Sequence, residues 1–101
     1  MTILMGKLST SGGGVPSEGA NLVRVSGDYQ ILVTDQYVIS DGGNTLTLPL
    51  LANATQPVYI INEGVTNDTV DGNGSTVPNS LTISPTEVRG FAPGTLAWVE
   101  V

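Results

Sequence analysis

Residues that form tight turns recur about every eight to twelve positions through most of this chain, leaving room only for short extended segments between them. The expected turns are Gly27-Asp28, Asp41-Gly42-Gly43-Asn44, 53–56, 64–68, 71–74 and 92–94. β-Branched and alternating residues fill the intervals, and no segment keeps apolar residues at helical spacing for three turns. The pattern predicts an all-β domain and nearly excludes helix.

Nine strands are expected between these turns. They span 22–26, 29–34, 36–40, 45–50, 57–62, 69–71, 80–84, 86–91 and 95–101. Because Asp-Gly and Asn-Gly favour hairpin turns, residues 37–49 (YVISDGGNTLTLP) are expected to form a hairpin, with Leu46, Leu48 and Leu50 facing the core. The predicted fold is a small antiparallel β-sandwich or jelly-roll-like domain, or a β-barrel.

The first twenty residues differ in composition from the rest. STSGGGVPSEGAN is rich in Gly and Ser, which predicts a flexible arm over 1–20 followed by a β-domain over 21–101. Ile3, Leu4, Met5 and Leu8 form an apolar patch ahead of this stretch. We expect the patch to dock on another chain or on a neighbouring subunit.

The charge balance excludes several kinds of partner. The net charge is −6, and the three basic residues, Lys7, Arg24 and Arg89, stand far apart, which argues against nucleic acid and anionic membranes. A domain of 101 residues buries only roughly 60 to 65% of its unfolded surface, and without cysteine it has no disulfide. Self-association is the expected source of added stability. The apolar opening is too short for a secretory signal, and no run of about 18 apolar residues would span a membrane.

Candidate chemistry is sparse. Without histidine or cysteine there is no Ser-His-Asp or Cys-His triad, so no catalytic residue and no cofactor are expected. Asp35 with Asp41, or Asp68 with Asp71, could serve as a glycosidase pair, but all four fall in predicted turns, where aspartate is a preferred residue. The run DTVDGNGS lacks the glycine and glutamate of a calcium loop, which favours a tight turn over a metal site and leaves calcium at Asp68 and Asp71 open.

The motifs, taken in order, resemble a known family of β-domains. Between Asp35 and Val101 the motifs are "DQYVISDGGNTLTLP", "PVYIINEG", "TVDGNGS", "LTI" and "GFAPGTLAWVEV", and the resemblance covers roughly residues 28–101. They resemble a domain of tailed-bacteriophage structural proteins found in fibres, tail tips and capsid decoration proteins. The resemblance implies a homotrimer and carries no catalytic motif.

We therefore expect a capsid decoration (cement) protein, made in the host cytoplasm, that binds the major capsid protein on the outer surface of a phage head and stabilises it. The attachment residues expected in the arm are Met1, Ile3, Leu4, Met5, Lys7 and Leu8. Because the chain has no heptads and no internal repeat, it fits a compact decoration protein better than a fibre. The alternative is a receptor- or glycan-binding tip domain that uses Tyr37 and Trp98, although Trp98 is expected in the core. A small hydrolase is the weakest reading.

Overall fold

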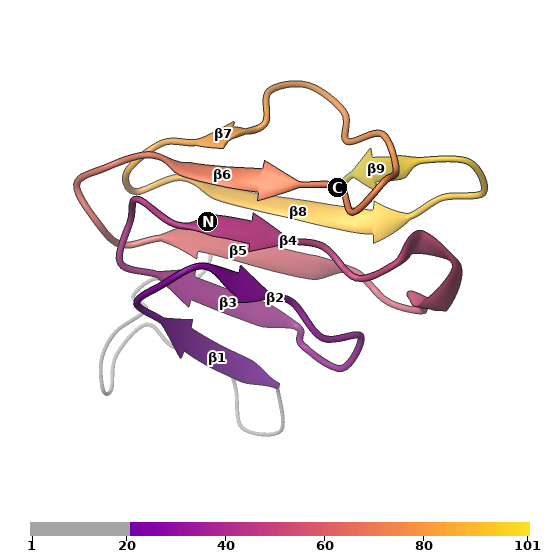
Figure 1. Cartoon of the computed structure of the whole chain (residues 1–101), viewed down its shortest axis with the longest axis horizontal. Coiled ribbons are helices and arrows are strands. Elements are labelled where there is room, and N and C mark those ends of the chain that lie inside the picture. The colour runs from indigo at the N-terminus through magenta and orange to yellow at the C-terminus, as the bar shows by residue number, and fades with distance from the viewer. Residues whose placement is uncertain (1–20) are drawn as a thin grey trace.

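The computed structural model describes residues 21–101, which form two β-sheets stacked as two layers (Figure 1). The expected arm over 1–20, with its six attachment residues, lies outside the described residues. The all-β prediction is confirmed, and each of the nine strands overlaps the range expected for it. A single turn of 3-10 helix, η1 (Leu51–Asn53), adds the only helical element within 21–101.

The larger sheet has five strands in the order β1-β3-β5-β8-β9. Its strands are β1 (Leu22–Val25), β3 (Tyr37–Ser40), β5 (Val58–Asn62), β8 (Val88–Pro93) and β9 (Trp98–Glu100). β1, β3 and β5 run parallel, whereas β8 and β9 each run antiparallel to the strand before them in the sheet.

The smaller sheet has four strands in the order β2-β4-β6-β7. Its strands are β2 (Tyr29–Gln30), β4 (Thr45–Thr47), β6 (Asp68–Asp71) and β7 (Thr82–Ile83). β2, β4 and β6 run parallel, and β7 pairs antiparallel with β6. From β1 to β6 the chain therefore crosses from one sheet to the other after every strand and winds as a coil.

This winding corrects two predictions. Residues 37–49 do not form a hairpin, because β3 and β4 lie in different sheets and the Gly42-Gly43 turn joins them as an arc, with φ of 92° and 77°. The antiparallel sandwich is also wrong for the strands up to β6, which pair in parallel with the next turn of the coil. Both sheets stay open at their edges, so the domain is not a closed barrel.

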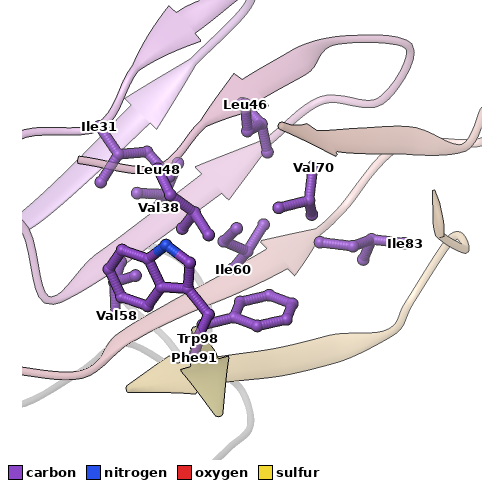
Figure 2. Packing of buried hydrophobic residues seen from close by; sticks show 10 residues of the cluster. All are labelled: Ile31, Val38, Leu46, Leu48, Val58, Ile60, Val70, Ile83, Phe91 and Trp98. Carbon is purple, nitrogen blue, oxygen red and sulfur yellow. The ribbon is translucent and has the colours of Figure 1, made fainter. Parts of the chain in front are cut away.

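The core lies between the sheets (Figure 2). Its ten buried side chains come from both layers and from the arcs: Ile31, Val38, Leu46, Leu48, Val58, Ile60, Val70, Ile83, Phe91 and Trp98. Leu46 and Leu48 face inward as predicted, but Leu50 does not: it lies past the end of β4 and is 53% exposed. Figure 2 shows the Trp98 ring among the other side chains of this core.

Buried polar side chains fasten the arcs that connect the sheets at one end. The Oδ1 atom of Asp68 accepts hydrogen bonds from the Ser40 hydroxyl at 2.8 Å and from the backbone N–H of Asn44 at 3.0 Å. The Asn44 amide donates to Ser40 Oγ at 2.8 Å. A Cβ atom added to Gly64 would overlap the carbonyl oxygen of Asp41, so successive arcs touch through their backbones. These contacts hold the arc in which the chain passes from Ser40 into the second sheet.

Candidate functional site

The first candidate surface is the side of the five-stranded sheet that faces away from the core, called here the outer apolar face. Side chains alternate across a strand, so every second residue of this sheet points outward. We define the outer apolar face by the large apolar residues among them on β3, β5 and β8 and at β9: Tyr37, Ile39, Tyr59, Ile61, Val88, Val99 and Val101. None belongs to the core cluster. Four neighbouring strands thus continue the apolar character of the core onto the opposite side.

Aromatic rings organise the middle of the outer apolar face. The Tyr37 and Tyr59 rings stack with centroids 5.7 Å apart and an interplanar angle of 22°. The Tyr59 ring covers Gly90, where an added Cβ would lie 2.5 Å from Tyr59 Cε1. Ile39 and Ile61 are 2% and 9% exposed, while Val99 at the sheet edge is 51% exposed. The face combines a packed centre with an accessible apolar rim.

The charges next to the outer apolar face cancel each other. Arg24 Nη1 of β1 lies 2.8 Å from Glu63 Oε1, which follows β5, so the ion pair bridges the intervening strand β3. Both side chains are well exposed, and pairs of this kind contribute about 0 to 1 kcal/mol to stability. Within the part of the chain that the structure describes, this pair adds no net charge beside the face, whereas the whole chain carries −6.

The second candidate surface is a groove where β2, β4 and β6 end, called here the end groove. Its volume is about 530 Å³. It is lined by Gln30, Ile31, Leu32, Val33, Thr34, Pro49, Leu50, Asn53 and Asn73. Leu32 and Leu50 are both more than half exposed, and among residues 21–101 no side chain in the lining carries a charge. Exposed apolar groups gathered in a concave site are typical of protein contact surfaces.

The carboxylates considered for catalysis are not brought together. Asp35 precedes β3 and Asp41 follows it, so they lie at opposite ends of one strand. On β6, Asp68 is buried and points inward whereas Asp71 is exposed, which also corrects their placement in turns. Neither pair faces across a cleft, as glycoside hydrolysis requires.

Asp35 has a structural contact with Tyr29. The Tyr29 hydroxyl donates to Asp35 Oδ2 at 2.8 Å, and the backbone N–H of Leu32 donates to the same oxygen at 2.8 Å. Burial, followed by the hydrogen bond and negative charge of Asp35, raises the pKa of Tyr29 to about 12. The contact ties β2 to the loop that leads back to β3.

Asp71 closes a local turn. Its Oδ1 accepts the backbone N–H of Asn73 at 2.8 Å. Across residues 21–101, no three His, Cys, Asp or Glu side chains converge as metal ligands.

Arg89 joins the two sheets through its buried guanidinium. Its Nε and Nη2 atoms donate to Glu100 at 2.9 and 2.8 Å, and Nη1 donates to the carbonyl oxygen of Thr82 on β7 at 3.0 Å. The hydrogen bond with Glu100 raises the pKa of Arg89. In turn, the hydrogen bond from Arg89 lowers the pKa of Glu100. Arg89 is therefore part of the framework of the domain.

The two residues considered for glycan contact lie on different sides of the five-stranded sheet. Tyr37 points outward, whereas Trp98 is 3% exposed and belongs to the core. Sequence reasoning missed both the outer apolar face and the end groove. A signal for the former was available, because YVIS and VYIIN are apolar at successive positions and would place apolar groups on both sides of their strands.

Comparison with family models, with curated protein sequences and with solved structures gave no match. Of the helical structure within 21–101, none is long and apolar enough to cross a membrane.

Proposed function

We propose that this protein acts by contact: it is a capsid decoration protein that assembles as a homotrimer on the outer surface of a phage head. The observation that carries the proposal is the end groove, an uncharged apolar concavity on a strongly acidic chain. Water-exposed leucines such as Leu32 and Leu50 are unfavourable on a free surface, and burial against a protein neighbour relieves that cost.

Two further features support a role in assembly. The motif order over residues 28–101 resembles phage virion domains that are homotrimeric. A protein that binds only the assembled shell stabilises it by mass action, and three linked attachment arms raise the effective affinity above that of one. The attachment residues proposed for each arm are Met1, Ile3, Leu4, Met5, Lys7 and Leu8.

The mass of the protein in solution tests the assembly step. Light scattering on the full chain is expected to give about 31 kDa, three times the chain mass of 10.4 kDa. The double variant Leu32→Asp, Leu50→Asp is expected to shift the mass toward one chain, because it places charges in the end groove. Thr47→Asp, on the outer side of β4, is the matched control and should keep the wild-type mass. A mass of 10.4 kDa for the wild-type protein would rule out the proposed trimer.

Binding to heads purified without the protein tests the attachment step. Wild-type protein is expected to cosediment with such heads and to raise the temperature at which they release their contents. Replacing Leu4 and Met5 with aspartate should weaken cosedimentation at least tenfold. Equal binding by this variant would show that attachment does not use the arm.

A further inference from the structure

We infer that the apolar segment of residues 3–8 docks on the outer apolar face of its own chain when the protein is free in solution. The inference goes beyond the proposed function, since it concerns the molecule before any shell is bound. It assigns an occupant to a face that neither the proposed trimer nor the end groove uses.

The outer apolar face and the segment of residues 3–8 have matching chemistry. The face presents the Tyr37–Tyr59 stack with an apolar rim at Val88 and Val99, and its flanking ion pair is neutral. The segment ILMGKL has four large apolar side chains, Ile3, Leu4, Met5 and Leu8, and a single cation, Lys7. Its positive charge suits a domain with an acidic balance, and its apolar side chains need a surface that the Gly- and Ser-rich residues behind it do not provide.

The point where the chain enters the domain places the segment within reach. Asn21 leads directly into β1, the edge strand of the five-stranded sheet. Residues 9–20 number twelve, and a Gly- and Ser-rich chain of that length has a root-mean-square extension of about 19 Å. The four spacings between five strands at about 4.8 Å give a sheet width of about 19 Å. The extension of residues 9–20 thus matches the width of the five-stranded sheet. The local concentration of the segment at its own face is then on the order of millimolar, which favours docking within one chain.

Docking of this kind would keep the proposed attachment residues out of water and away from other free copies. A shell seam then competes with the outer apolar face for the same segment. Attachment becomes an exchange of one apolar contact for another, so free protein is protected from association through its arms.

Disulfide trapping tests the inference cleanly, because the chain has no cysteine of its own. In the full chain, Leu4→Cys is combined with Val88→Cys on the outer apolar face. The matched control combines Leu4→Cys with Thr69→Cys, which is exposed on the outer side of the four-stranded sheet. With dilute protein and oxidised glutathione, the Val88 pair is expected to form a disulfide within one chain at least tenfold faster than the Thr69 pair, as followed by mass spectrometry.

Equal rates for the two pairs, or disulfides only between chains, would overturn the inference. A second measurement does not depend on cysteine geometry: the full-length variant Leu4→Asp, Met5→Asp should bind more of the apolar dye ANS and unfold at a lower temperature. Unchanged dye binding and unfolding temperature would also overturn the inference. Neither readout involves heads or subunit mass, so failure here is distinguishable from failure of the proposed function.

Discussion

The two sheets are built alike and differ in what they show to the outside. Each begins with three parallel strands and ends in antiparallel pairing, and each sends Val, Ile, Leu or aromatic side chains into the common core. The four-stranded sheet presents Thr45, Thr47 and Thr69 on its outer side, whereas the five-stranded sheet presents the outer apolar face. Threonine rows are stable in water, but an apolar sheet side normally has a cover. The difference makes the outer apolar face of the five-stranded sheet the side on which we infer that residues 3–8 dock.

The connection between the sheets gives the largest expected effect. Gly64→Ala should destabilise the domain by roughly 3 kcal/mol or more, because the new methyl group overlaps the carbonyl oxygen of Asp41 in the neighbouring arc. Gly27→Ala, in the arc between β1 and β2, meets no atom of residues 21–101 within 4 Å and should change stability by less than about 0.5 kcal/mol. Chemical denaturation of both variants measures the difference. Equal losses would mean that the sheets do not depend on contact between arcs.

The tie between β8 and β7 ranks second. Arg89→Met should cost about 3 kcal/mol, because it removes the bond to Thr82 and leaves Glu100 without its cation. The matched change Arg24→Met, in the exposed pair with Glu63, should cost less than about 1 kcal/mol. Urea unfolding monitored by Trp98 fluorescence compares the two. A similar cost for both would show that burial of Arg89 adds nothing to the pairing of the sheets.

A substitution on each outer side tests the comparison directly. Ile61→Ala, on the outer apolar face, should cost about 2 kcal/mol because Ile61 is 9% exposed and loses buried apolar contact. Thr69→Ala, on the outer side of the four-stranded sheet, should cost less than about 0.5 kcal/mol, since its side chain is exposed. Thermal unfolding of both variants gives the ranking. A larger loss of stability for Thr69→Ala than for Ile61→Ala would contradict the distinction between the outer sides of the two sheets.

The smallest expected effects are changes of folding stability with pH, and one residue in each sheet contributes such a change. Because the folded-state pKa of Tyr29 on β2 is raised from 10.0 to about 12, its contribution is complete below pH 10.0 and lost as pH rises toward 12. Because the folded-state pKa of Glu100 on β9 is lowered from 4.5, its contribution is complete above that pH and lost as pH falls through the lower value.

Stability measured against pH in the single variants separates these two contributions. Tyr29→Phe should flatten only the alkaline limb and Glu100→Gln only the acid limb. If both variants keep the wild-type dependence of stability on pH, the assignments to Tyr29 and Glu100 are both wrong.

The positions of the strands were predictable from the sequence, but their pairing was not. Turn chemistry at Asp41-Gly42-Gly43-Asn44 marks where a strand ends, and the same positive φ values serve a hairpin or an arc. The deciding contacts lie far apart in sequence: Asp68 bonds Ser40 and Asn44 across more than twenty residues. The coil also escapes a search for repeats, because Leu22 pairs with Tyr37 and Tyr37 with Tyr59, so successive turns have 15 and 22 residues.

The candidate surfaces were less predictable than the strands. Leu50 was expected in the core by extending the alternation of Leu46 and Leu48, but β4 ends at Thr47 and the η1 turn carries Leu50 outward into the end groove. The trimer, the phage head and the attachment role of residues 1–8 remain predictions that the experiments above address.

Because of the way the chain winds, the two ends of the sandwich differ in how they would accept an inserted peptide. Where Gly42 and Gly64 lie backbone to backbone, an inserted peptide would push adjacent turns of the coil apart. The opposite end has longer connections, 31–36 and 48–57, and both contribute to the lining of the end groove. A tag, an epitope or a fluorescent label grafted there would leave the touching arcs in place but would occupy the end groove, and so would block the contact proposed for the trimer.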